Sequence, residues 1–188
     1  MKVSLNKVRR DYLALIGESP GLSPILGEGE DSAVLTLEEE LSVRLIPAAI
    51  KATLECDPVH LDEIAECSPA IEWGDGGSAR LRLPEDYLRL HTLRMYGWKD
   101  SVTRVEPPGT LRDSLRGRAP AWMNCPDNPL VVEERDAAGP FLRVYGCPKA
   151  TERPEQLLYV PEPCIVGDDL KISKAAYRRM LELLIQAA

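Results

Sequence analysis

Hydrophobic residues recur at helical spacing near both ends of the chain. Residues 4–16 predict a short helix that Gly17 would end, with an apolar face made by Val8, Tyr12, Leu15 and Ile16. Residues 172–188 predict a second amphipathic helix with Ser173 as its N-cap and an apolar face made by Ile172, Ala176, Met180, Leu183, Leu184 and Ala187. The Gly-, Pro- and Ser-rich stretch between residues 17 and 32 predicts a loop.

A longer helical pattern begins at Thr36. Thr36 and Glu39 have the spacing of a capping box, and the stripe that follows consists of Leu37, Leu41, Leu45, Ala48, Ala49 and Ala52. Pro47 interrupts this stripe, so we expect a kink or a restart there. Asp57 and Pro58 then supply a cap and a first-turn proline, which predicts a second short helix over residues 58–67.

A period of two replaces the helical period after residue 71. Residues 80–83 alternate Arg-Leu-Arg-Leu, and the alternation resumes after Pro84. The other predicted strands are the return strand of a hairpin at 98–106, a hairpin at 130–147 with Asp136–Gly139 at its tip, and a strand at 155–163 that ends at Pro161 and Pro163.

This order of elements predicts an α+β fold, in which helices at the N- and C-terminal ends flank an antiparallel β region of hairpins. A chain of 188 residues is expected to form a single domain. Its expected parts are an N-terminal helix and flexible loop at 1–34, a helical part at 35–70, a β part at 71–165 and a C-terminal helix at 166–188.

The strand that follows Pro84 carries core and charged residues in alternation. The expected core residues are Leu88, Leu90, Leu93 and Met95, and the residues expected to face water or a partner are Arg89, His91 and Arg94. Trp98 should anchor the hairpin that this strand forms with residues 98–106. Gly97 should leave room for the Trp98 side chain. A plain core hairpin and a partner-contact face both account for the arginines.

Charge is distributed unevenly along the chain, which has a net charge of −7. Acidic residues dominate from residue 28 to 72, and basic residues dominate from 80 to 118. The two regions could be ordinary solvated faces, could pair within one subunit, or could pair head to tail between copies in a ring. The residues that we predict to contact partners are Arg89, Arg94, Arg112, Arg116, Arg118, Glu38 and Glu39.

Nucleic acid is a weaker candidate partner. An acidic chain does not attract nucleic acid through its net charge. The basic loop at residues 104–118, with Trp122 nearby, nevertheless leaves open a passing contact with DNA.

Five widely spaced cysteines without a CxxC motif predict free thiols in a reducing compartment rather than a disulfide framework. The first 20 residues lack the apolar core of a signal peptide, and no apolar run approaches membrane-spanning length. We therefore expect a cytoplasmic protein that makes no membrane contact.

Few residues suggest catalysis, metal binding or nucleotide binding. No GxSxG motif is present, and His60 and His91 are the two imidazoles, so a small Cys/His-dependent hydrolase remains an alternative. Cys56, His60 and Cys67 have no local fourth ligand for zinc, and Pro58 disturbs their helical spacing. The glycine-rich stretches 27–32 and 74–79 lack the P-loop lysine and the dinucleotide fingerprint. We predict no catalytic residues, no metal and no cofactor.

One family resemblance covers residues 35 to 188. The segments that carry it are "IEWGDGGSARLRLPEDYLRLHTLRMYGWKDSV", "RGRAPAWMNCPDNPLVV", "GPFLRVYGC" and "LLYVPEP". The chain resembles structural proteins of bacteriophages and prophages, in particular the head–tail connector (adaptor) proteins of tailed phages. The matching positions are Leu83, Pro84, Asp86, Tyr87, Arg89, Leu90, Gly97, Trp98, Tyr159, Pro161 and Pro163. The loop at 17–31 and the segment "AWMNCPDNP" have no counterpart in that pattern.

The resemblance implies a non-enzymatic virion-assembly protein that forms a ring and contacts portal, tail or capsid components, in the host cytoplasm and in the virion. It also implies that the matching residues are scaffold positions. The alternatives are the small Cys/His-dependent hydrolase and a nucleic-acid-contacting module that uses the loop at 104–118.

Overall fold

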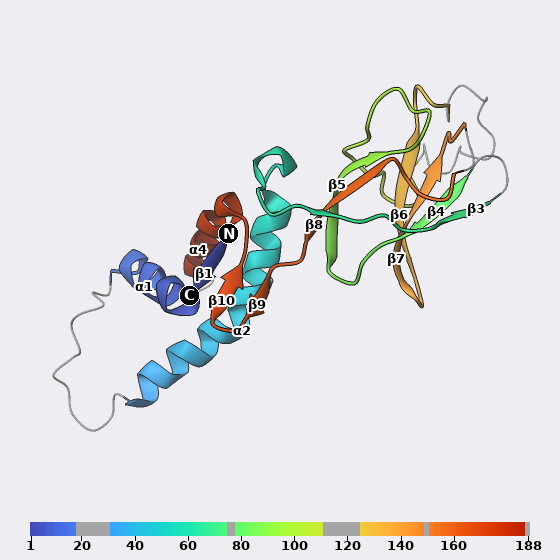
Figure 1. Ribbon diagram of the computed structural model, residues 1–188. Helices are drawn as coiled ribbons and strands as arrows, with labels where there is room; N and C mark the ends of the chain where they lie inside the picture. The colour runs from blue at the N-terminus through green and yellow to red at the C-terminus, as the bar shows by residue number, and fades with distance from the viewer. Residues whose placement is uncertain (18–30, 75–77, 111–124, 149–150, 187–188) are drawn as a thin grey trace. The chain divides into compact units, whose positions relative to one another are not determined.

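The protein has an α+β fold with antiparallel sheets and with helices at both ends of the chain, as the sequence predicts (Figure 1). The structure is a computed structural model that describes residues 1–17, 31–74, 78–110, 125–148 and 151–186, with only the backbone described for 31–40. The chain divides into two compact units. A helical unit contains Met1–Glu63 and Glu162–Ala188, and a β unit contains Ile64–Pro161.

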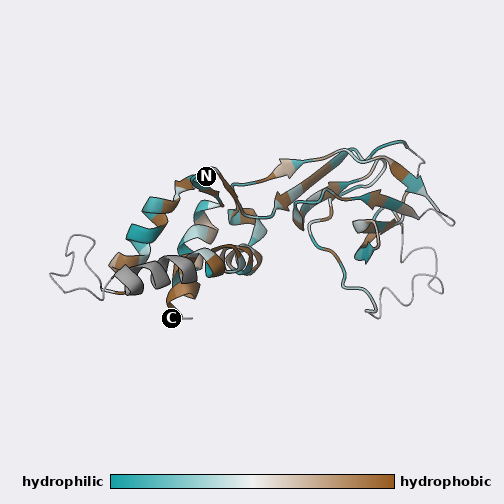
Figure 2. Ribbon diagram, turned by 90° about the horizontal axis from the view of Figure 1, so that it is seen from below, coloured by the Kyte–Doolittle hydropathy of each residue, from teal (hydrophilic) through white to brown (hydrophobic). Residues whose placement is uncertain are grey.

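These boundaries lie near those predicted between the helical and β parts, at 70/71 and 165/166. The sequence pattern favoured one domain for both parts, whereas the structure groups them as two units. Each unit has its own buried core. Hydrophobic and hydrophilic residues alternate along several strands and around the helices, as Figure 2 shows.

The helical unit begins with a short strand and a helix. Strand β1, Lys2–Ser4, leads into helix α1, Leu5–Leu15. Ser4 is the N-cap, and its side chain accepts a hydrogen bond from the Lys7 amide at 3.3 Å. Val8 and Tyr12 are buried as predicted, but Leu15 is 55% exposed. The apolar face of α1 is therefore shorter than the sequence pattern indicated.

Helix α2 corrects two predictions. It spans Asp31–Glu55, so Thr36 lies inside the helix and is not its N-cap. It also continues through Pro47 without a restart, although the proline has no N–H to donate to the carbonyl of Val43. In the second half of α2 the predicted stripe is buried at Leu45, Ala49 and Ala52.

The predicted second short helix is a single turn. A 3-10 helix spans Pro58–His60, and the Asp57 carboxylate accepts the Val59 amide at 3.1 Å. The chain is already extended at Leu61, and it forms strand β2 at Ala65–Glu66. The predicted cap is confirmed, but a helix reaching residue 67 is wrong.

A carboxylate from outside the helix caps the C-terminal helix, α4, which spans Lys174–Gln186. The Asp62 carboxylate accepts the Lys174 amide at 3.0 Å and the Ser173 hydroxyl at 2.6 Å. The Asp62 amide in turn donates to Ser173 Oγ at 3.3 Å. Ser173 precedes the helix as expected, but in these contacts its hydroxyl binds Asp62. The helix then buries Ala176, Tyr177, Met180, Leu181, Leu183 and Leu184.

A three-stranded sheet that joins the two ends of the chain was not predicted. Strand β9, Cys164–Val166, turns through Gly167 into β10, Asp169–Lys171, and β10 pairs antiparallel with β1. Gly167 has a φ of 63°, which suits the first central position of a type II′ hairpin turn. The amino group of Met1 donates to the carbonyl of Ile172 at 2.7 Å.

The β unit contains two sheets. One has the order β3-β4-β7-β6, with bounds Ile71–Trp73, Ala79–Arg82, Gly139–Tyr145 and Leu130–Asp136. The other has the order β2-β8-β5, with β8 at Gln156–Pro161 and β5 at Tyr87–Arg94. The predicted hairpin of β6 and β7 is confirmed, with Asp136 opposite Gly139 at the tip.

The partner of β5 differs from the prediction. β5 pairs with β8 instead of residues 98–106, which form only isolated bridges, Leu93 with Val102 and Glu106 with Val132. Two register shifts interrupt the β5–β8 pairing. Because a bulge adds one residue to one strand, burial recurs at Tyr87, Leu90 and Leu93 instead of at every second residue. Leu88, predicted to be in the core, is half-buried.

Trp98 is buried in the β-unit core and donates its indole N–H to the carbonyl of Gly146 at 3.0 Å. It is thus an anchor in the core as expected, but not for a hairpin with residues 98–106. Gly97 leaves room for Pro148 instead of for Trp98. It has a φ of 88°, and a Cβ added there would lie 2.5 Å from Pro148 Cγ.

Candidate interaction surfaces

A groove of about 660 Å³ lies between α2 and α4 in the helical unit. Its lining is mostly apolar and includes two cationic residues. The lining residues are Val43, Arg44, Pro47, Ala48, Lys51, Leu183, Leu184 and Gln186. Val43 is 74% exposed, an unusual position for a β-branched apolar side chain on a helix that otherwise packs against α4.

The charged residues that line this groove are cationic, and carboxylates lie nearby. Lys51 Nζ lies 4.0 Å from Glu55 Oε1, and both side chains are well exposed, so this ion pair is weak. Glu55 also accepts a hydrogen bond from Arg179 Nε at 2.7 Å. Arg44 and Lys51 are the charged residues among the groove lining, and no carboxylate of the described residues belongs to that lining.

Two of the predicted partner-contact residues, Glu38 and Glu39, lie in the first half of α2. The backbone there is helical, and their side chains fall outside the described residues. Three others, Arg112, Arg116 and Arg118, also fall outside the described residues. The predicted DNA-contacting loop at 104–118 is therefore described only as far as residue 110.

The remaining two predicted contact residues, Arg89 and Arg94, lie on β5 and are half-buried. Arg94 Nε is 3.2 Å from Glu155 Oε2, in an ion pair whose geometry is not that of a hydrogen bond. The Glu155 amide also donates to the carbonyl of Arg94 at 3.0 Å. Arg94 therefore already has a partner within the β unit. Arg89 is opposite Val160 in the ladder, beside the first register shift.

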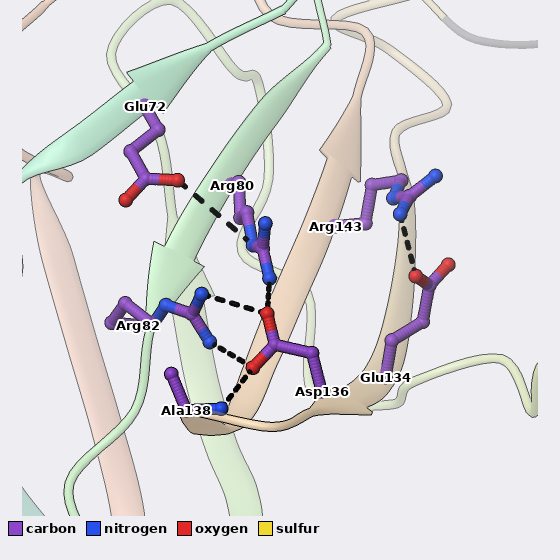
Figure 3. A network of polar contacts seen from close by, with 7 residues as sticks. All are labelled: Glu72, Arg80, Arg82, Glu134, Asp136, Ala138 and Arg143. Atoms are coloured by element: carbon purple, nitrogen blue, oxygen red, sulfur yellow. Dashed lines mark hydrogen bonds and ion pairs between the residues drawn. The ribbon is translucent and has the colours of Figure 1, made fainter.

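A second charged surface covers one face of the four-stranded sheet (Figure 3). Arg82 binds Asp136 through two hydrogen bonds of 2.6 and 2.8 Å, and Arg80 binds the same carboxylate. The Ala138 amide donates to Asp136 at 2.9 Å. The hydrogen bonds from Arg82, followed by this amide and the nearby arginine charges, lower the pKa of Asp136 well below its ordinary value.

The same face contains a second pair and an aromatic ring. Arg143 donates to Glu134 at 2.6 Å, and Arg80 Nε lies 3.9 Å from Glu72. The Arg80 guanidinium lies 3.8 Å from the centre of the buried Phe141 ring. Three arginines thus meet three carboxylates, which indicates a charge-balanced surface. Of these contacts, the one between Glu72 and Arg80 joins the acidic region 28–72 to the basic region 80–118 within one subunit.

Two tyrosines of the β2-β8-β5 sheet pack together, and one of them reaches a carboxylate of the other sheet; no sequence pattern predicted this contact. The rings of Tyr87 and Tyr159 lie 6.0 Å apart, and their hydroxyls donate to Glu133 and Asp86, each at 2.9 Å. Burial, and then the hydrogen bond to Asp86, raise the pKa of Tyr159 to about 12. Burial, and then the Glu133 charge, raise the pKa of Tyr87 further.

Adjacent carboxylates of β6 bind different partners. Glu133 accepts from Tyr87 and Glu134 accepts from Arg143. The turn after Pro84 closes through the hydrogen bond from the Tyr87 amide to the Pro84 carbonyl, while the Asp86 carboxylate accepts a hydrogen bond from the Tyr159 hydroxyl.

Burial affects two of the thiols, and the two imidazoles differ in their surroundings. Burial raises the pKa of Cys67 to about 11 and that of Cys147 to about 12, so both thiols are protonated at neutral pH. His60 is exposed, and His91 contacts the neighbouring Thr92 hydroxyl at 2.9 Å. Cys56 and His60 belong to the helical unit, whereas Cys67 belongs to the β unit.

Among the described residues, no group of three or more His, Cys, Asp or Glu side chains is placed to hold a metal ion. The helices within the described ranges include none that is long and apolar enough to cross a bilayer.

Neither the known protein-family models nor the curated protein sequences match this chain.

Proposed function

We propose that this protein is a non-enzymatic structural subunit of a phage or prophage virion, similar to a head–tail connector, and that it acts through protein–protein interfaces. In this proposal it assembles with further copies of itself and with portal, tail or capsid components. Assembly takes place in the cytoplasm of the bacterial host, and the assembled subunit remains in the virion.

The residues that carry the family resemblance support this proposal, because most of them form the scaffold of the β unit. Leu83, Tyr87, Leu90, Trp98 and Tyr159 are all at most 9% exposed. None of these residues lines the groove between α2 and α4. The features that would contact partners are therefore separate from the residues that hold the fold.

The groove between α2 and α4 is the observation that carries the proposal. A mostly apolar concave surface of about 660 Å³ that includes the exposed Val43 is suited to receive a protein segment. Its lining also contains two charged side chains, Arg44 and Lys51. Interfaces between protein subunits likewise combine apolar and polar residues.

The mass of the purified protein in solution tests the proposal. We expect oligomers in sedimentation velocity and light scattering, either for the protein alone or after mixing with phage portal and tail proteins. Negative-stain microscopy of the oligomer should then show rings.

A purified chain that stays monomeric at every soluble concentration, both alone and with those portal and tail proteins, would contradict the proposal. A catalytic activity that depends on a cysteine and a histidine would favour the hydrolase alternative instead. Alkylating the thiols separates the two functions, because it abolishes such an activity but leaves an interface built from Val43 and Lys51 chemically unchanged.

A further inference from the structure

The fold brings two cationic helices together from opposite ends of the chain. Helices α1 and α4 pack against each other in the helical unit (Figure 1), and each contains three lysines or arginines against one carboxylate. The strands that precede them, β1 and β10, pair in one sheet. These four elements contain eight lysines and arginines against three carboxylates, in a chain with a net charge of −7. An acidic protein therefore has one cationic region.

A tyrosine of α4 marks the place where the cations of the two helices meet. The Tyr177 hydroxyl donates to Asp11 of α1 at 2.8 Å, and Lys7 Nζ lies 5.7 Å from the centre of the Tyr177 ring. Lys174 lies one turn before Tyr177 on α4, and Arg178 follows it directly. The side chains of three cations thus surround one contact between the helices.

The exposed cations of α1 and α4 are Lys7, Arg10, Lys174 and Arg178, and we call these four residues the cationic surface. Lys7 Nζ lies 2.9 Å from Asp11 Oδ2, but Lys7 is 50% exposed, so water and salt screen this ion pair. Arg179 is not part of the surface, because it binds Glu55 and Glu182 at 2.7 and 2.9 Å. The surface therefore presents more positive than negative charge to the solvent.

Several cations of this region stand where they cost stability. The N-terminus of a helix favours carboxylates, because the helix dipole is positive there. Lys7 nevertheless lies in the first turn of α1 and Lys174 is the first residue of α4, and over their described residues neither helix has an acidic residue in its first turn. On the strands, Lys2 lies directly opposite Lys171, where like charges repel. Glu63 offsets part of that repulsion, since it lies 3.7 Å from Lys171.

From this arrangement we infer that the cationic surface binds the phosphate backbone of double-stranded DNA. The inference goes beyond the proposed function, and the surface differs from the loop at 104–118. Lysines and arginines are the side chains that neutralise phosphates, and such contacts require no recognition of base edges. An anion bound among these cations would also relieve the unfavourable placement of Lys7 and Lys174.

Two other anionic partners fit the surface less well. Single-stranded nucleic acid is held by aromatic rings that stack on its bases, but the aromatic residues of α1 and α4, Tyr12 and Tyr177, are both buried. A membrane-surface helix inserts its apolar face into the bilayer, but α1 buries Val8 and Tyr12 within the helical unit. The DNA duplex needs neither an exposed ring nor an exposed apolar face.

Local charge decides this binding, because the Debye length is only about 8 Å at physiological ionic strength. Negative charge elsewhere on the chain is therefore largely screened at the cationic surface. Each phosphate that is neutralised releases counterions, so the logarithm of the binding constant falls with the logarithm of salt concentration by about 0.9 per phosphate. When all four cations contact phosphates, we expect a slope of about −3 to −4.

Fluorescence anisotropy with a fluorescein-labelled DNA duplex of arbitrary sequence tests the inference. The wild-type protein should bind at low salt with the slope given above. R10Q/K174Q/R178Q should lower the affinity roughly tenfold or more and make the slope shallower by about 2 to 3. The matched control also removes one lysine and two arginines, all of them exposed in the β unit, and it is K99Q/R135Q/R153Q. This control should change neither the affinity nor the slope.

A single variant keeps the test independent of folding. Arg10 is exposed, so R10Q should leave the melting temperature unchanged and still weaken DNA binding, and it serves where the triple variant fails to fold. The inference is wrong if the wild-type protein does not bind the duplex at low salt, or if the control loses as much affinity as R10Q/K174Q/R178Q. Binding to phosphatidylserine vesicles without binding to the duplex also overturns it. The oligomer mass, which tests the proposed function, is measured separately, so either idea can fail alone.

Discussion

Gly97 occupies a position in the β unit where the structure accepts only glycine without strain. Its φ of 88° lies in a region that residues with a side chain rarely adopt, and Pro148 Cγ occupies the space where a Cβ would stand. The sequence correctly indicated Gly97 as a residue that leaves room. The expected neighbour was wrong, because Trp98 is adjacent in sequence while Pro148 reaches Gly97 only in the folded β unit.

Replacing Gly97 with alanine is therefore expected to destabilise the β unit by about 2–4 kcal/mol, from the unfavourable φ together with the clash. Gly109 is the matched control, because its φ is 80° and nothing lies within 4 Å of the position that an added Cβ would take. Gly109→Ala should cost only about 1 kcal/mol. Urea unfolding followed by tryptophan fluorescence measures both. Equal losses for the two variants would show that Pro148 moves aside.

At the scale of elements, the start of α4 depends on a carboxylate that is distant in sequence. Asp62 accepts both the Ser173 hydroxyl and the Lys174 amide. Removing this acceptor in Asp62→Ala should destabilise the helical unit by about 1 kcal/mol, as for other helix caps. Asp62→Asn keeps an acceptor oxygen and should cost less. Urea unfolding followed by far-ultraviolet circular dichroism measures the difference.

The contribution of the Asp62 charge should also depend on pH. The hydrogen bond from Ser173, outweighing burial, lowers the pKa of Asp62 below its ordinary value of 3.8. A carboxyl group whose folded-state pKa is lowered stabilises the fold above its unfolded pKa and loses that contribution as pH falls through the folded pKa. The stability difference between wild type and Asp62→Asn should thus be constant near neutral pH and shrink below about pH 4. A difference that persists in strong acid would contradict this assignment.

Strand β5 carries a prediction that follows from its register shifts. The sequence placed Leu88, Leu90 and Leu93 in the core, whereas the observed burial includes Leu90 and Leu93 but not Leu88. Leu93 is fully buried, so Leu93→Ala should cost about 2–5 kcal/mol. Leu88 is half-buried, so Leu88→Ala should cost roughly 1 kcal/mol. If urea unfolding shows that both variants lose the same free energy of unfolding, Leu88 and Leu93 contribute equally to the core and this interpretation of β5 is wrong.

The sequence predicted the elements whose stabilising contacts are local. Periodicity identified α1 and α4, and the Asp136–Gly139 tip identified the β6–β7 hairpin. The Gly167-Asp168 pair is also a local hairpin signal, and it could have revealed β9 and β10. Pairings between distant segments were not predictable. The β5–β8 and β1–β10 ladders join residues that no local pattern relates, and the partner of Asp62 is likewise remote.

For the candidate interaction surfaces, the sequence indicated charged residues but not their neighbours. It could not show that Arg80 and Arg82 share Asp136, because the carboxylate lies at the far end of a hairpin. It also could not show the groove between α2 and α4, since that depends on how two distant helices pack. Contacts of Glu38 and Glu39 with a partner remain predictions.

At the scale of the whole molecule, the two units should unfold separately. The helices α1, α2 and α4 belong to the helical unit, whereas Trp73, Trp98 and Trp122 all fall within the sequence range of the β unit. Far-ultraviolet circular dichroism therefore reports mainly on one unit, and tryptophan fluorescence reports on the other. Two units with separate cores need not melt together, because two-state behaviour is a property of single domains. We expect non-coincident urea transitions by the two probes.

Variants in each unit test whether the two units unfold separately. Gly97→Ala should move the fluorescence transition and leave the dichroism transition nearly in place, while Asp62→Ala should do the reverse. The β unit is one continuous segment, so residues 64–161 expressed alone should also unfold cooperatively, with Trp98 protected from quenchers as its burial requires. If both variants instead shift both probes equally, the units unfold as one, and the stability of each depends on the other.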